Sequence, residues 1–211
     1  MNSARPVLII DYGMGNIGSI RNMLRYVGAR AEVVTQPDQL VDACGIILPG
    51  VGHFDRAMGN LRQTGMADAL NEVARRASVP VLGICLGMQL MCKSSEEGTE
   101  QGFGFFDAVV RRFSFEANSR LKVPHMGWNE VAVRQPNTVL GDETPPWSRY
   151  YFVHSYYVSC ENSEDVIGTT RFGIEFVSAI RCRNLVGVQF HPEKSHRFGM
   201  QLFRNFVKSL S

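Results

Sequence analysis

Short apolar runs alternate with amphipathic segments through the first half of the chain. Four runs are apolar at nearly every position, which is typical of strands buried on both faces. These runs are residues 7–10, 32–34, 45–48 and 79–82. Apolar residues recur at helical spacing over 17–27, and two further helices are predicted between Phe54 and Arg76, broken near Gly65. The alternation predicts a parallel sheet covered by helices on both sides.

The pattern changes beyond Gly102 to short strands typical of hairpins. The predicted strands are residues 106–113, 129–133, 150–158, 175–181 and 186–190. An amphipathic helix is predicted near 197–210, and 136–146 has the composition of a surface loop. The sequence contains no internal repeat and no linker suited to a domain boundary. We therefore expect one domain over 1–211, an α/β fold with a central, mostly parallel sheet flanked by helices and a β-rich C-terminal half.

The run 79–82 leads directly into Gly83-Ile84-Cys85-Leu86-Gly87, before a predicted helix over 88–91. A reactive side chain on such a strand-to-helix turn is held exposed, and the glycines leave room for a tight backbone and a substrate. The following helix favours a thiolate and offers N–H groups to a developing oxyanion. The pentapeptide alone is equally consistent with a buried structural cysteine.

A second motif, His191-Pro192-Glu193, follows the predicted strand 186–190. A cysteine nucleophile needs a general base, and the base needs an orienting partner. Histidine titrates near neutral pH, and a carboxylate two residues on can fix its tautomer. Alone, this tripeptide is more often a loop with a solvated acid, but the two motifs together indicate one site. We therefore assign Cys85 as nucleophile, His191 as base and acid, and Glu193 as the orienting carboxylate.

These motifs and four further segments resemble the class I, triad-type glutamine amidotransferases. The segments are DYGMGN at 11–16, LPGVG at 48–52, VPHMGWN at 123–129 and YFVHSY at 151–156. Together they are similar to the glutaminase subunits of imidazole glycerol phosphate synthase, over about residues 7–206. The resemblance implies hydrolysis of glutamine to glutamate and ammonia through a thioester, with no cofactor and no metal. It also implies a heterodimer with a (β/α)8-barrel cyclase subunit, which uses the ammonia to make imidazole glycerol phosphate and AICAR in histidine biosynthesis.

The substrate-binding residues are predicted around the nucleophile. Glycines let backbone N–H groups approach the substrate amide closely. The N–H of Gly50 or Val51, in the segment that ends at Gly52, is therefore expected to join the Leu86 N–H in an oxyanion hole. Gln89 lies one helical turn after the nucleophile and faces the same way, so it is a candidate to bind the α-amino or carboxylate group of glutamine. Without the resemblance, it would be an exposed polar position of a helix. The resemblance adds a second segment for this α-amino and carboxylate end of glutamine. The segment consists of His154, Ser155 and Tyr156.

The resemblance also predicts the interface with the partner. A tryptophan in a loop is usually a core residue, but the segment 124–129 is expected on the face where ammonia leaves. The predicted interface residues are Asn16, His125, Met126, Trp128 and Asn129.

The segment Gly13-x-Gly15-x-x-Gly18 satisfies the dinucleotide-binding pattern G-x-G-x-x-G. The acidic residue expected at the end of the second strand is not in place, since Glu32 begins that strand. We interpret the segment as a tight turn between a strand and a helix.

The composition argues against nucleic-acid or membrane binding and for a reducing cellular compartment. The 211 residues are 45% hydrophobic and 20% charged, which is ordinary for a soluble domain, and the net charge of +2 gives no indication of nucleic-acid binding. No segment has the length of a membrane span or the features of a secretory signal. The five cysteines lack metal-ligand spacing. We expect a cytoplasmic protein with free thiols at Cys44, Cys92, Cys160 and Cys182.

Two alternatives remain open. A paralogous subunit could supply ammonia to another acceptor, such as a surface-polysaccharide sugar, because the segments 17–20 and 194–200 differ slightly from the histidine-pathway pattern. A non-enzymatic binding module on the same fold is the second alternative. The intact Cys85, His191 and Glu193 argue against it.

Overall fold

The computed structural model describes residues 5–77, 79–116, 118–135, 139–141 and 147–210. Its central feature is a mixed sheet whose first half is parallel, in the order β2-β1-β3-β4-β12. The strands are β1 (Val7–Ile10), β2 (Ala31–Val34), β3 (Gly45–Leu48), β4 (Val81–Ile84) and β12 (Leu185–Val188). The predicted parallel sheet is therefore confirmed, with β4 displaced two residues toward the C-terminus from its expected position.

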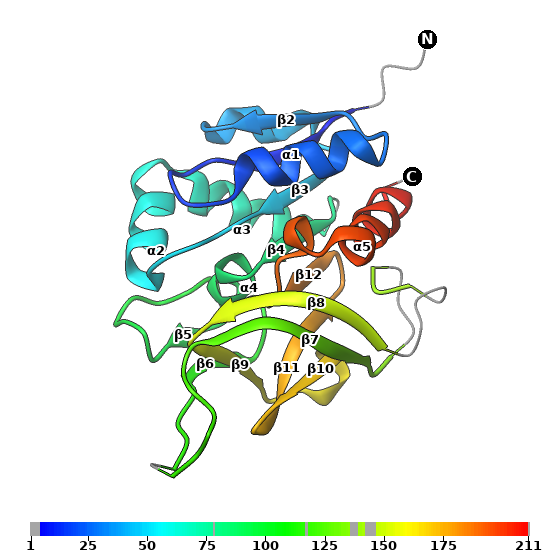
Figure 1. Cartoon of the computed structure of the whole chain (residues 1–211). Coiled ribbons are helices and arrows are strands. Elements are labelled where there is room, and N and C mark those ends of the chain that lie inside the picture. Colours follow the sequence, from blue (N-terminus) through cyan, green and yellow to red (C-terminus); the bar gives the residue numbers. More distant parts are fainter. Residues whose placement is uncertain (1–4, 78, 117, 136–138, 142–146, 211) are drawn as a thin grey trace.

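Helices cover both faces of the parallel half (Figure 1). Neighbouring residues of β1 point to opposite faces, so Leu8 packs in the cluster that holds α2 and α3, while Ile9 packs in the cluster that holds α1 and α5. The helices are α1 (Ile17–Tyr26), α2 (Phe54–Gln63), α3 (Met66–Arg76) and α5 (His196–Lys208). Gly65 separates α2 from α3 at a φ of +74°, a backbone conformation that favours glycine, and this confirms the predicted break.

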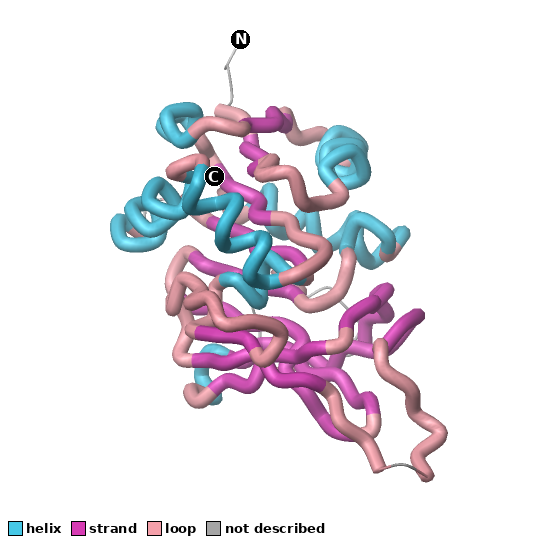
Figure 2. Tube along the Cα trace, turned by 90° about the vertical axis from the view of Figure 1, so that its left-hand side faces the viewer, coloured by secondary structure: helices cyan, strands magenta, loops and turns pink. Residues whose placement is uncertain are grey.

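The second half of the sheet is antiparallel and continues the order from β12 as β11-β10-β7-β8. Strand β9 pairs with both β6 and β11, and β6 also pairs with the short β5. In Figure 2 this strand-rich half lies in the lower part of the view, below the parallel strands and their flanking helices. The strands are β5 (Ser94–Ser95), β6 (Ala108–Arg112), β7 (His125–Val133), β8 (Trp147–His154), β9 (Tyr156–Cys160), β10 (Val166–Phe172) and β11 (Ile174–Cys182).

Three expectations for this half were wrong. The single strand predicted over 150–158 is broken at Ser155, and the two pieces pair with different strands. Strand β10 was not predicted, because its sequence VIGTTRF has no clear alternation. The segment around Trp128, expected in a loop, belongs to β7. The loop predicted over 136–146 lies largely outside the described residues.

The carboxyl ends of the parallel strands meet at one edge of the sheet, where open α/β sheets bind their ligands. The segment 49–52 follows β3, Cys85 follows β4 and His191 lies just beyond β12. Among the described residues, no helix combines the length and apolar character needed to cross a membrane.

Candidate active site

The Cys85 backbone is strained. Cys85 lies between β4 and α4 (Leu86–Leu90), with φ +54° and ψ −109°, a conformation that residues other than glycine rarely adopt. Such a residue costs about 1–3 kcal/mol and persists only when its surroundings hold it in place. The Cys85 N–H donates to the Val188 carbonyl at 2.8 Å, and the Cys85 carbonyl accepts from the Met88 N–H at 3.1 Å. The predicted strand-to-helix turn is confirmed.

Glycines are required around this turn because backbone segments touch there. A Cβ atom on Gly87 would lie 1.9 Å from the Leu48 carbonyl oxygen, and one on Gly83 would lie 2.8 Å from the Gly87 carbonyl oxygen. A Cβ atom on Gly50 would lie 2.8 Å from the Gly87 nitrogen. The segment after β3 and the turn after β4 are therefore pressed against each other.

His191 and Glu193 form a buried pair beside the cysteine. His191 Nδ1 lies 2.8 Å from Glu193 Oε1, and the two side chains are 2% and 1% exposed. Asn16 Nδ2 donates to the same carboxylate oxygen at 3.3 Å. The structure thus brings the residues predicted for a triad to one place. It also gives Asn16, predicted only for the partner interface, a contact inside the site.

The electrostatics of the site favour a protonated His191. Burial by itself lowers the pKa of this imidazole, but the negative charges of Cys85 and Glu193 outweigh burial and raise the pKa to about 10. The Cys85 sulfur raises this pKa both as a negative charge and as a hydrogen-bond acceptor for the ring. The carboxylate therefore fixes the ring through Nδ1 and leaves Nε2 for the reacting groups.

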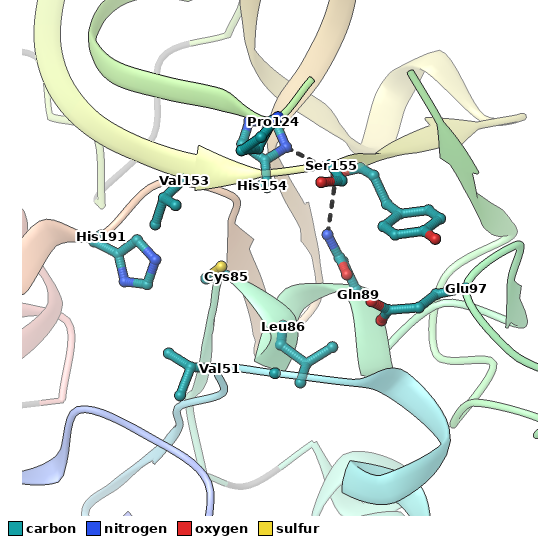
Figure 3. A pocket seen from close by; sticks show the side chains of 12 residues that line it. Val51, Cys85, Leu86, Gln89, Glu97, Pro124, Val153, His154, Ser155 and His191 are labelled. Carbon is teal, nitrogen blue, oxygen red and sulfur yellow. Dashed lines mark hydrogen bonds between the residues drawn. The ribbon is translucent and has the colours of Figure 1, made fainter. Parts of the chain in front are cut away.

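A cavity of about 340 Å³ opens over the nucleophile. In Figure 3 Cys85 lies between His191 on one side and Gln89 and Ser155 on the other. The lining residues are Val51, Gly52, Cys85, Leu86, Gln89, Glu97, Pro124, Val153, His154, Ser155, Tyr156 and His191. The predicted substrate-binding residues thus surround one cavity, except Gly50, which is buried against Gly87.

Two residues that border or support the site were not predicted from the sequence. Glu97 lines the cavity and accepts a hydrogen bond from the Phe54 N–H at 2.8 Å, at the start of α2. Ser195 is completely buried; its hydroxyl donates to the His191 carbonyl at 2.6 Å and accepts from the Tyr151 N–H at 3.0 Å. Its position two residues after Glu193, at the end of the His-Pro-Glu motif, was the available signal for Ser195. Nothing in the sequence pattern marked Glu97.

The predicted interface residues divide between surface and interior. Met126 is 62% exposed and Trp128 is 40% exposed. Trp128 stacks on His196 with ring centroids 5.6 Å apart. His125 was expected on the same surface, but its side chain is 3% exposed and lies against His154, so this expectation was wrong. Side chains of a strand alternate between its faces, which places His125 inward and its neighbour outward.

Sequence comparisons match the geometry. A family model described as "Glutamine amidotransferase class-I" matches residues 8–210. The "Imidazole glycerol phosphate synthase subunit HisH 2" of Methanococcus maripaludis is 48% identical over 202 residues, which cover 96% of this chain and 98% of that protein. The chain belongs to the HisH family of class I glutamine amidotransferases. It is accordingly an enzyme, a glutaminase, and the alternative of a non-enzymatic module is set aside.

Other relatives of this amidotransferase agree. HisH of Moorella thermoacetica is 47% identical, with 96% of this chain and 94% of that protein covered. Among solved structures, PurLQS from Thermotoga maritima has a TM-score of 0.77 at 17% identity, covering 98% of this chain and 100% of that one. A crystal structure described as a glutamine amidotransferase has a TM-score of 0.73 at 20% identity, covering 97% of this chain and 98% of that one. At this identity the structures show the fold alone, and they confirm the predicted fold class.

Replacing Glu193 with glutamine tests the buried pair of this amidotransferase. The change keeps the side-chain shape but removes a charge that raises the pKa of His191, so we expect that pKa to fall. Glutamine turnover should fall about 100-fold or more, because the ring loses its orienting carboxylate. NMR titration of the His191 ring measures the first effect, and glutamate release measures the second. The exposed Glu161→Gln is the matched control, and an unmoved His191 pKa in Glu193→Gln would contradict the assignment.

Proposed function

We propose that this chain is the glutaminase subunit of an imidazole glycerol phosphate synthase, acting as one domain over 1–211. The observation that carries the proposal is the 48% identity to a protein named as a HisH subunit of that synthase, over 98% of its length. The cavity with Cys85, His191 and Gln89 on its walls supports it, since one glutamine molecule needs a nucleophile, an acid and polar groups for its far end.

In the first half of the reaction, the Cys85 thiolate attacks the side-chain amide carbon of glutamine. The oxyanion forms where Leu86 and Val51 line the cavity, so their backbone N–H groups are the expected donors. The new carbon–sulfur bond displaces the carbon–nitrogen bond, and the His191 imidazolium gives its proton to the departing nitrogen. The raised pKa of His191 keeps that proton available at neutral pH.

In the second half, water attacks the γ-glutamyl thioester while His191, now neutral, takes its proton. Glutamate leaves with the oxygen of that water, and the thiolate and imidazolium are restored. Glu193 holds the ring through Nδ1 during both transfers. Gln89 and Ser155 lie across the cavity from His191 (Figure 3), and His154 and Tyr156 line the same cavity. This arrangement suits them to hold the α-amino and carboxylate groups of glutamine.

Ammonia that reaches bulk water is protonated and lost as a nucleophile, so it passes to a partner. We assign the acceptor chemistry to a (β/α)8-barrel cyclase subunit that forms a heterodimer with this chain. The exposed Met126 and Trp128 on β7 supply apolar surface for that contact, and Asn16 and Asn129 belong to the same predicted interface set. The thiol chemistry suits a reducing cytoplasm, and we include neither nucleic acid nor membrane among the partners.

Reconstitution tests the proposed function. The full chain is mixed with the histidine-pathway cyclase of its own organism, and imidazole glycerol phosphate is measured with glutamine as the nitrogen source. We expect glutamine-dependent product at a rate similar to that with an ammonium salt. The cyclase alone with ammonium salt is the control for an active barrel. No product from glutamine, while the chain hydrolyses glutamine beside a different barrel protein, would contradict the histidine assignment.

A paralogous subunit serving another acceptor, such as a surface-polysaccharide sugar, is the second candidate. The observation that favours it is the name HisH 2 of the relatives from Methanococcus maripaludis and Pseudomonas aeruginosa, which numbers each of them as a second such protein. The same reconstitution separates the two candidates, because only the partner differs.

A further inference from the structure

A buried amide side chain lies beside the nucleophile. Gln189 directly follows β12, has an exposed fraction of 0%, and its Nε2 donates to Cys85 Sγ at 3.7 Å. The sulfur thus has an amide donor in addition to the His191 ring, which also interacts with it. Burying an amide is unfavourable unless its polar atoms are paired, and both polar atoms of Gln189 have a partner.

The direction of the Gln189 amide follows from a backbone carbonyl. The Tyr156 carbonyl oxygen only accepts hydrogen bonds, so Gln89 Nε2, at 3.2 Å, donates to it. The same Gln89 nitrogen donates its other hydrogen to Gln189 Oε1 at 2.9 Å. Because the Gln189 oxygen is used as an acceptor there, its nitrogen is the atom that faces Cys85. The sulfur therefore meets a donor rather than an acceptor.

The same carbonyl fixes two histidines. His154 Nδ1 lies 2.8 Å from the Tyr156 oxygen and must donate to it. Burial lowers the pKa of His154 to about 3, so its ring is neutral and Nε2 is an acceptor for His125 Nδ1 at 2.9 Å. His125 Nε2 then accepts from Asn129 Nδ2 at 3.1 Å. The chain of hydrogen bonds from Asn129 on β7 to Cys85 is thus consistent: each bond joins one donor to one acceptor.

We propose that Gln189 is a further catalytic residue, which donates a hydrogen bond to the Cys85 thiolate and holds it for attack on glutamine. This inference rests on the proposed role of Cys85 as nucleophile. A hydrogen bond to a charged acceptor is stronger than one to a neutral acceptor, so Gln189 favours the thiolate over the thiol. It also restrains the side-chain torsion of Cys85, whose backbone is already fixed by the strained turn.

The pH dependence of Cys85 alkylation tests the proposal in the full chain. Iodoacetamide reacts with the thiolate, and mass spectrometry of the Cys85 peptide gives the midpoint. We expect Gln189→Met, which keeps the volume but removes the donor, to raise this midpoint by about 1 pH unit. Gln189→Glu should raise it further, since its carboxylate repels the thiolate. The partly exposed Cys160 in the same sample is the reference thiol.

The other charged and titratable groups near Cys85 are unchanged in these variants, so the shift reports Gln189. These groups are Tyr12, Glu97, His154, His191 and Glu193. Gln201→Met, which removes an amide from the partly buried face of α5, is the matched control and should leave the midpoint unchanged.

An unchanged Cys85 midpoint in folded Gln189→Met or Gln189→Glu would overturn the proposal and leave Gln189 a packing residue. Thermal unfolding shows whether each variant is folded. In the unmodified chain, NMR of the Gln189 side-chain amide gives an independent answer: its resonances should shift with the same midpoint as alkylation, and a flat titration would also overturn the proposal. These readouts need no partner, so they stay informative whichever acceptor the ammonia serves.

Discussion

Replacing Cys85 with alanine is expected to abolish glutamine-dependent synthesis by the complex and to leave ammonium-dependent synthesis intact. Alanine lacks the thiolate that forms the thioester, and removing a nucleophile of this type costs at least about 10⁴-fold in turnover. The fold should survive, because the change removes one sulfur atom from a side chain that borders a cavity. Glutamate release and product formation, each with glutamine and with ammonium salt, are the measurements.

The matched control for this variant is Cys160→Ala, which removes a partly exposed free thiol far along the chain from the turn. It should leave both activities unchanged. Glutamine turnover that survives in Cys85→Ala would show that the nucleophile assignment is wrong. Loss of the ammonium-dependent activity as well would indicate damage to the complex rather than to the chemistry.

Replacing Gly87 with alanine is expected to destabilise the protein and to remove glutaminase activity together. The added Cβ atom would lie 1.9 Å from the Leu48 oxygen and 2.9 Å from the Leu48 carbonyl carbon. Both are backbone atoms of a strand that is paired with β4, so no side-chain rotation relieves the overlap. Overpacking of this kind costs about 3 kcal/mol, which lowers the melting temperature by about 6–12 °C in a domain of this size.

Gly59→Ala in α2 is the matched control for this change, since an added Cβ atom there meets nothing within 4 Å. Alanine is the better helix former by up to about 1 kcal/mol, so this variant should unfold at the same or a higher temperature. Differential scanning calorimetry and glutamate release compare the two. Equal melting temperatures and equal turnover in both variants would contradict the contact between the two backbone segments.

The parallel half of the fold was predictable because its signals are local. Strands such as 7–10 are apolar at each position, and the helices between them carry a clear period. The β-rich half was less predictable because the boundaries of its strands depend on partners far along the chain. Ser155 ends β8 where the chain passes from pairing with β7 to pairing with β6 and β11, and no local breaker marks that change.

The sequence by itself determined the chemistry of this protein. Cys85, His191 and Glu193 stand at strand ends that a parallel sheet must bring to one edge, and the flanking glycines indicate the tight turn between them. Only the tertiary structure decided which polar atoms meet. Gln189 lies 104 residues from Cys85 along the chain and 100 from Gln89, and these separations leave no pattern in the sequence. His125 is buried for the same reason: its contacts come from strands that fold around it.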